Sequence, residues 1–176
     1  MGTKTWTASI DGVEIKVTNH FSVLGWESWE SLSVGDRLVQ RNDGGMWRPS
    51  SFLSTRVETP YGIKEISALI AGLGFSVGCH IFSDGELVAG DTESKLNAPS
   101  PVEWDIAKTK GVAHFLLLRG VMGMGVPFAL MLTLVNVISG DHSIGQSVLM
   151  FVINCILFGL VMGYFQWWSF RKLYDE

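Results

Sequence analysis

The sequence predicts an all-β domain, a small β-sandwich or barrel of about eight strands, followed by a hairpin of two transmembrane helices. The distribution of charge is the first reason. Between Gly111 and Phe170 only Arg119 and Asp141 are charged, whereas residues 1–110 carry ten Lys or Arg and fourteen Asp or Glu. Two solvents, water and lipid, would demand such a separation. The second reason is a series of Asp-Gly turns between short alternating segments. The predicted parts are a β domain (1–91), a linker (92–110), a helical hairpin (111–170) and a cytoplasmic tail (171–176).

Alternating polar and apolar residues predict the strands of the first domain. The turns expected between them are Asp11-Gly12, Gly35-Asp36 and Asp84-Gly85. Strand segments are expected within residues 5–17, 29–41, 51–57, 64–71 and 79–88. With turns at these intervals and no helical pattern, an all-β sandwich or barrel follows.

Two of these segments resemble one another. SLSVGDRLV (residues 31–39) and HIFSDGELV (residues 80–88) share an apolar position, a central turn and a trailing Leu-Val. This similarity suggests a duplicated hairpin unit.

Two apolar runs predict the membrane spans, at about residues 114–138 and 144–166, each reaching the roughly 20 residues that a helix needs to cross a bilayer. Lysines precede the first span, Arg171 and Lys172 follow the second, and the connection at 139–145 has no Lys or Arg. The positive-inside rule therefore places both termini in the cytoplasm and the connection outside. The first residues lack an apolar signal sequence, which agrees with an integral inner-membrane protein whose β domain is cytoplasmic.

Three polar residues in the spans are candidates for a role within the membrane. Arg119 lies near the cytoplasmic end of span one, where its side chain is expected to snorkel to the headgroups. Gln166 should lie at a similar depth on span two and share a hydrogen bond with Arg119. Asn154 is nearer mid-membrane and is expected to face the other helix.

Small residues are expected to pack the helices. Gly159 and Gly163 form a GxxxG pair in span two, which allows either close packing within the hairpin or association of two copies of the chain. Glycines also cluster at the start of span one, at positions 120, 123 and 125. Pro127 is expected to kink span one.

Three tryptophans are candidate partner-binding residues: Trp26, Trp29 and Trp47. Strand alternation would send Trp26 and Trp29 to opposite faces, so one of them would be exposed, as tryptophans at recognition surfaces are. The alternative is that Trp26 belongs to a loop folded back on the core.

The sequence points away from an enzyme. It contains no GxSxG, HExxH or P-loop motif, and His20 and His80 are not spaced with acidic residues as metal ligands. If an active site existed, Cys79, His80 and Asp84 would be the first group to test, but a structural role is favoured at each position. No cofactor is expected, and the formal charge of −4 on residues 1–110 excludes nucleic acid as a partner.

Two short stretches carry a family resemblance. The segment SDGELVAGD (residues 83–91) resembles the end of small β-sandwich domains in uncharacterised two-span bacterial inner-membrane proteins. The opening, with Trp6 and the run Ile10-Asp11-Gly12-Val13, is similar to the β-sandwich of Fas apoptotic inhibitory molecules. The resemblance implies a non-enzymatic binding sandwich and no transferable site residues.

The first functional hypothesis is a membrane-anchored binding protein. Its most concrete form is a bacterial inner-membrane immunity protein that neutralises a membrane-targeting antibacterial toxin. The alternatives are a regulatory or scaffold subunit and a membrane-tethered ligand sensor or enzyme. The expected partners are the lipid bilayer, a protein such as a toxin, and a second copy of the chain through the helices.

Overall fold

The structure, a computed structural model, describes residues 2–22, 27–44, 50–73, 76–139 and 144–175. The chain divides into two compact units, Met1–Val102 and Glu103–Glu176, which are described separately below. Trp26, Trp47 and Asp141 lie outside the described residues.

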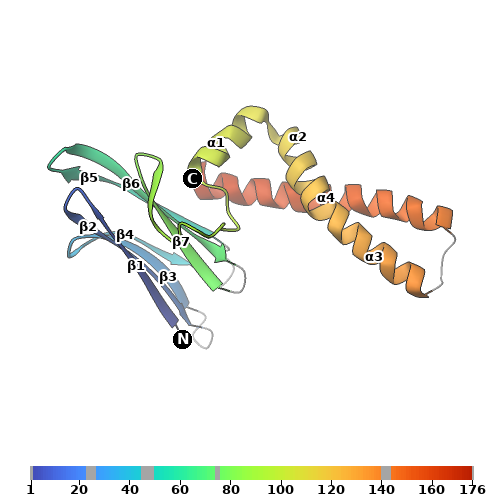
Figure 1. Ribbon diagram of the computed structural model, residues 1–176, viewed down its shortest axis with the longest axis horizontal. Coiled ribbons are helices and arrows are strands. Elements are labelled where there is room, and N and C mark those ends of the chain that lie inside the picture. Colours follow the sequence, from blue (N-terminus) through green and yellow to red (C-terminus); the bar gives the residue numbers. More distant parts are fainter. Residues whose placement is uncertain (1, 23–26, 45–49, 74–75, 140–143, 176) are drawn as a thin grey trace. The chain divides into compact units, whose positions relative to one another are not determined.

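The first unit contains two four-stranded antiparallel sheets, each made of consecutive strands (Figure 1). We call them sheet A, with the order β1-β2-β3-β4, and sheet B, with the order β5-β6-β7-β8. The predicted all-β class with about eight strands is confirmed. The strands are β1 (Gly2–Ile10), β2 (Val13–Ser22), β3 (Glu27–Val34), β4 (Arg37–Gly44), β5 (Ser50–Thr59), β6 (Gly62–Leu73), β7 (Ser76–Ser83) and β8 (Glu86–Gly90).

All three predicted turns are present and close hairpins. Asp11 and Asp84 have left-handed φ angles of 53° and 50°, and the glycines that follow them, Gly12 and Gly85, have φ angles of 81° and 84°. Two successive positive φ values are typical of the type I′ turn, whose twist matches that of the flanking strands. These dipeptides therefore set the register of β1–β2 and β7–β8.

The predicted duplication extends beyond one hairpin. In β3–β4, Leu32 pairs with Gln40, and the register shifts directly after Leu32; in β7–β8, Ile81 pairs with Ala89, and the register shifts directly after Ile81. Position 81 is 49 residues after position 32, and the β5–β6 turn at 60–61 is likewise 49 residues after the β1–β2 turn at 11–12. With the same offset of 49 residues, the register of β6–β7 is shifted by two residues relative to that of β2–β3. A shift of two keeps every side chain on the same face of its sheet. Sheet B therefore repeats the layout of sheet A.

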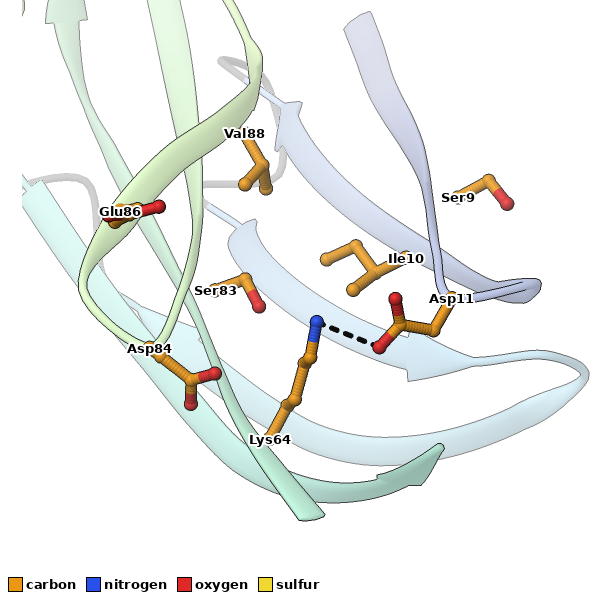
Figure 2. Close-up of a pocket in the computed structure, with 8 residues that line it drawn as sticks. All are labelled: Ser9, Ile10, Asp11, Lys64, Ser83, Asp84, Glu86 and Val88. Atoms are coloured by element: carbon orange, nitrogen blue, oxygen red, sulfur yellow. Dashed lines mark ion pairs between the residues drawn. The ribbon is translucent and has the colours of Figure 1, made fainter. Parts of the chain in front are cut away.

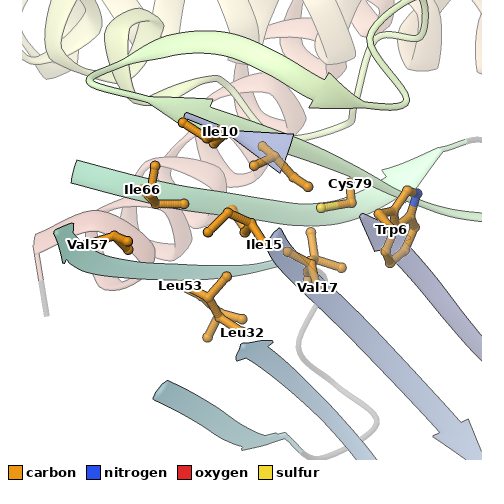
Figure 3. Packing of buried hydrophobic residues seen from close by; sticks show 12 residues of the cluster. Trp6, Ile10, Ile15, Val17, Leu32, Leu53, Val57, Ile66 and Cys79 are labelled. Atoms are coloured by element: carbon orange, nitrogen blue, oxygen red, sulfur yellow. The ribbon is translucent and has the colours of Figure 1, made fainter. Parts of the chain in front are cut away.

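One hydrophobic cluster is shared by the inner faces of both sheets (Figure 3). In β2, buried Ile15 and Val17 alternate with exposed Glu14 and Lys16, as expected for a strand with one face in the core. The members of the cluster are Trp6, Ile10, Ile15, Val17 and Leu32 from sheet A, and Leu53, Val57, Ile66, Ala68, Ile70, Cys79 and Ile81 from sheet B.

The segment that follows β8 packs against sheet B. The His80 ring, on the face of β7 opposite to the core, lies with Nε2 3.1 Å from the carbonyl oxygen of Asp91 and 2.9 Å from that of Ser94. Leu96 is buried and contacts Gly78, which shares that face. Residues 92–100, the first part of the predicted linker, are thus an integral layer of the sheet unit.

The second unit is helical. Two of its apolar stretches, Val112–Asn136 and Gly145–Asp175, are long and apolar enough to cross a membrane. The second continues about nine residues past the predicted end of span two, so the residues expected to form a tail are mostly helical. The helices are α1 (Pro101–Lys110), α2 (Val112–Phe115), η1 (Leu116–Gly125), α3 (Val126–Ser139) and α4 (Ile144–Asp175).

The first apolar stretch changes helix type along its length. Its middle part, η1, is a π-helix of 10 residues. Pro127 is the second residue of α3, directly after η1, in the first turn, where a missing N–H disrupts a helix least. The irregularity expected at Pro127 is therefore a boundary between π-helix and α-helix.

Candidate functional site

Five side chains from all four strands of sheet A form a continuous row, here called the Trp29 ladder: Thr3, His20, Trp29, Arg41 and Asp43. The register places Thr3 opposite His20, His20 opposite Trp29, and Trp29 opposite Asp43. The His20 and Trp29 rings stack with centroids 5.2 Å apart at 15°, and the Arg41 guanidinium lies 4.7 Å from the Trp29 centroid. Thr3 Oγ1 lies 2.9 Å from His20 Nδ1, and Arg41 Nε donates to Asp43 Oδ1 at 2.7 Å. Each side chain of the ladder is thus held by a neighbour.

The ladder lies on the face of sheet A that points away from the shared core. Leu32 and Glu30 are buried on the inner face, and strand alternation places Trp29 on the other. Because β2 and β4 flank β3, His20 and Arg41 contact Trp29 from opposite sides. The faces of the indole are therefore occupied, and its edge is what a partner would meet. Tryptophan and arginine together are the side chains most enriched at binding hot spots of protein interfaces.

Cys79, His80 and Asp84, the first group to test if an active site existed, are not brought together. Cys79 is in the core, and burial raises the pKa of its thiol to about 12. His80 points to the opposite face of the same strand, toward backbone carbonyls. Asp84 lies at the β7–β8 turn, where its Oδ1 accepts the backbone N–H of Glu65 at 2.9 Å. A thiol that stays protonated and a histidine on another face do not form a nucleophile–base pair.

An open cleft of about 410 Å³ lies at the turn end of the sheets (Figure 2). Its central contact is an ion pair in which Lys64 Nζ lies 2.7 Å from Asp11 Oδ2. Thr59 Oγ1 donates to the same oxygen at 3.1 Å. The hydrogen bond from Lys64 lowers the pKa of Asp11, and that bond also raises the pKa of Lys64. Both groups stay charged near neutral pH, which suits a structural clamp better than proton transfer. The cleft is lined by Ser9, Ile10, Asp11, Lys64, Ser83, Asp84, Glu86 and Val88.

Asp91, which sequence reasoning did not single out, connects β1 to β7. Its Oδ2 accepts hydrogen bonds from Trp6 Nε1 at 2.9 Å and from the Cys79 backbone N–H at 3.0 Å, and pairs with Lys4 Nζ at 3.4 Å. Burial raises the pKa of Asp91, but the hydrogen bonds from Cys79 and Trp6 and the charge of Lys4 outweigh it, and the pKa lies below its ordinary value. Only the position of residue 91, directly after a turn-centred hairpin, could have drawn attention to it.

The helical unit contains a tightly packed aromatic group, here called the Trp104 cluster. Trp104 is only 1% exposed, and its ring centroid lies 6.3 Å from that of Phe115, 4.8 Å from Trp167, 6.0 Å from Phe170 and 6.2 Å from Tyr174. The cluster attaches α1 to α2 and to the end of α4.

The predicted polar residues of the helices have different surroundings. The Arg119 guanidinium lies 5.8 Å from the Phe115 ring and 6.0 Å from the Phe170 ring. Gln166 Oε1 is buried and has no hydrogen-bond partner among the described residues, so the expected bond between Arg119 and this oxygen is absent there. Asn154 is half-buried, and its contact with span one stays a prediction.

Glycines from both stretches meet at the helix interface. A Cβ added to Gly120 would collide with the carbonyl oxygen of Gly159, and one added to Gly125 would collide with that of Cys155. A Cβ on Gly163 would lie 2.9 Å from Gly120 Cα. Gly159 and Gly163 therefore pack within the hairpin, the first of the two alternatives that the sequence left open.

In comparisons with known proteins, no family model matches the chain, and neither a curated protein nor a solved structure is similar to it. Among the described residues, no three His, Cys, Asp or Glu side chains are grouped so that they could hold a metal ion. The resemblance to two-span bacterial inner-membrane proteins and to Fas apoptotic inhibitory molecules stays a prediction.

Proposed function

We propose that the chain is an integral membrane protein whose two apolar helices anchor a β-sandwich that binds a protein partner. The observation that carries this proposal is that many apolar side chains of the two helices are exposed on the protein surface. Leu118, Leu134, Leu149 and Leu157 are 53%, 54%, 61% and 60% exposed. A soluble protein rarely leaves so large a contiguous apolar surface in water, and lipid would cover it.

The low burial of the helices supports the same proposal. In the most apolar window of each helix, only 22% and 17% of the residues are buried inside the protein, which is unlike the core helix of a soluble domain. The glycine interface holds the two helices together on one side, and the remaining surface of each is apolar. Flanking positive charges favour both termini on the cytoplasmic side, with the connection outside.

The sheet unit supports a binding role rather than catalysis. Both sheets contribute to one packed cluster, as in a β-sandwich, and the described cleft is open and holds an ion pair. The Trp29 ladder offers an aromatic and cationic row on a sheet face, a composition suited to protein recognition. The narrower hypotheses of toxin immunity and of a scaffold subunit stay predictions about the identity of the partner.

Membrane insertion is tested by expressing the full chain and extracting membranes at alkaline pH. We expect it to stay in the membrane pellet and to be released only by detergent. A variant with Leu149→Lys and Leu157→Lys should lose stable insertion, because a lysine at mid-helix costs about 3 kcal/mol on insertion scales. Release of the unmodified chain by alkaline extraction would contradict the anchor.

Recognition by the ladder is tested by a photo-reactive amino acid at Thr18, which is half-buried and neighbours His20 on the same face of β2. We expect one defined protein crosslink that is lost in Trp29→Ala. Tyr61→Ala is the matched control, because Tyr61 is an aromatic residue that is 83% exposed and lies on the β5–β6 turn of the other sheet. A crosslink that survives Trp29→Ala, or is lost equally in Tyr61→Ala, would exclude the ladder as the binding surface.

A further inference from the structure

Arg119 is the charged residue within the first apolar stretch, and its guanidinium is held in a defined place. It lies over the rings of Phe115 and Phe170, at 5.8 and 6.0 Å from their centroids. Phe170 is directly followed by Arg171 and Lys172, so the guanidinium lies level with the basic end of α4. This is the depth at which lipid headgroups would meet the helices if they cross a bilayer.

The positive charge of Arg119 is not neutralised by a carboxylate among the described residues. Lys108, on α1, pairs with Asp105 at 2.9 Å and with Asp175 at 3.1 Å, and these bonds raise its pKa. Arg119 forms no ion pair with the part of the chain described, and its contacts there are two apolar rings. Lys108 is therefore neutralised by carboxylates of the protein, whereas Arg119 is available for an external anion.

The chemistry of the site favours a phosphate. A guanidinium presents five N–H donors in a planar fork, and phosphate oxygens match that fork with two parallel hydrogen bonds. The rings of Phe115 and Phe170 lie within about 6 Å of the guanidinium, where a cation–π attraction holds the charge without using its N–H donors. Arg119 is half-buried, so a bound anion would interact with it in a less polar environment than water.

We propose that Arg119 binds the phosphate of an anionic phospholipid, with the rings of Phe115 and Phe170 as the floor of the site. The proposal rests on the membrane insertion proposed above. An anionic lipid is favoured over a zwitterionic one because exposed Lys110 and Arg171 lie at the same end of the unit and add positive potential. Lipid binding would then fix the depth of the helices in the bilayer.

The test is native mass spectrometry of the full chain in detergent, titrated with phosphatidylglycerol, phosphatidylcholine or inorganic phosphate. We expect phosphatidylglycerol to bind most tightly. In Arg119→Gln its binding should weaken by about tenfold, as expected for loss of a charge-assisted pair. Arg119→Lys keeps the charge and loses the fork, so it should bind with intermediate affinity.

Arg56→Gln is the matched control, because Arg56 is an exposed arginine of β5 in the sheet unit and takes no part in the proposed site. It should change binding by less than about twofold. Equal binding by Arg119→Gln and the unmodified chain, or an equal loss in Arg56→Gln, would overturn the site. Equal binding of phosphatidylcholine or of inorganic phosphate would overturn the anionic lipid as its ligand.

Failure of this proposal is separable from failure of the membrane anchor. Alkaline extraction reports insertion whether or not a lipid is bound at Arg119. Loss of fold in Arg119→Gln would appear as a changed circular dichroism spectrum, and the Arg119→Lys comparison then decides the outcome. A chain that is inserted but whose lipid affinity is the same in all three Arg119 forms refutes the lipid site alone.

Discussion

At the scale of single residues, Asp91 connects the two sheets of the sheet unit. One carboxylate oxygen receives the Trp6 indole, the Cys79 backbone N–H and the Lys4 ammonium. Trp6 is in sheet A and Cys79 is in sheet B, so this oxygen connects the two sheets where the chain leaves β8. Removing this carboxylate is costly, because the buried Trp6 and Cys79 would each lose an N–H acceptor.

We expect Asp91→Ala to lower the free energy of unfolding of the sheet unit by about 1–3 kcal/mol. The measurement is urea unfolding of the full chain in detergent, with hydrogen exchange of the β7 amides as a local readout. Glu93→Gln is the control, because Glu93 is exposed on the same segment. Equal stability of Asp91→Ala and Glu93→Gln would show that the three contacts contribute nothing.

The same carboxylate predicts a pH dependence. Its pKa is lowered in the folded protein, so its stabilisation is present above the unfolded-state value of about 4 and is lost as the pH falls through the folded-state value. The loss of stability below about pH 4 should therefore be steeper in the unmodified chain than in Asp91→Asn. Parallel pH profiles for the two proteins would contradict this assignment.

Cys79 should be chemically inert in the folded protein. Burial raises the pKa of its thiol to about 12, and the thiolate is the form that reacts. In a Cys155→Ser background, iodoacetamide at pH 8 should label Cys79 only after the chain is unfolded. Rapid labelling of the native chain would show that the thiol is accessible and ionised, and would reopen the possibility of a catalytic role.

At the scale of elements, the π-helix explains how the glycines of the first stretch face the second helix. Buried Gly120 and Gly125 are five residues apart, a spacing that an α-helix would place on different faces. The wider turn of a π-helix brings them to one side, and both contact α4. Neither Gly159 nor Gly163 is then free to pack on another copy of the chain.

We expect Gly159→Leu to separate the two helices, because even a Cβ at this position would lie 2.5 Å from Val121 Cα. The measurement is disulfide formation between a cysteine at position 121 and the native Cys155, whose Sγ lies 3.9 Å from the Val121 carbonyl oxygen. The crosslink should form in a Cys79→Ser chain and be lost on adding Gly159→Leu.

Gly123→Leu is the control for that crosslink, because a Cβ there has only an ordinary contact at 3.4 Å with the Leu118 carbonyl oxygen. The disulfide should still form in this variant. If it persisted in Gly159→Leu as well, the close approach of the helices would not depend on glycine.

At the scale of the whole molecule, the chain consists of one unit built around a shared apolar core and another with its apolar side chains outward. The sheet unit buries Ile15, Val17, Leu32, Leu53 and Ile66 completely. The helical unit exposes most of its leucines and valines, which suits a solvent of lipid. The proposed anchor and binding domain follow from this contrast.

The proposed topology makes a prediction about single-cysteine variants that lack Cys79 and Cys155. An impermeant thiol reagent added outside intact cells should label Gly145→Cys and should not label Lys110→Cys. Gly145 has open space around it, so the new side chain should be tolerated. Labelling of both positions, or of Lys110→Cys alone, would contradict a hairpin with a cytoplasmic α1.

Local patterns in the sequence were sufficient for most strands and for the two apolar helices, but α1 (Pro101–Lys110) lies where a linker was expected. Asp-Gly pairs force positive φ angles and so mark hairpins, and period-two alternation marks strands with one buried face. Length and hydropathy alone mark the two apolar helices. A similarity between two hairpins was visible in nine residues, but the shared layout of the two whole sheets needed the register of the strand pairs.

Contacts between distant residues could be decided only by the tertiary structure. The Trp29 ladder joins positions 3, 20, 29 and 43 because four strands align them. The Asp11-Gly12 turn sets the register of β1–β2, but no local pattern specifies which residues of β2 and β3 face each other. Asp91 and the Trp104 cluster likewise depend on partners many residues away, and the guanidinium of Arg119 meets Phe170 rather than the expected Gln166 oxygen. The sequence by itself determined where strands, turns and apolar helices lie, because these depend on neighbours along the chain. Which side chains meet was decided by packing, because it depends on neighbours in space.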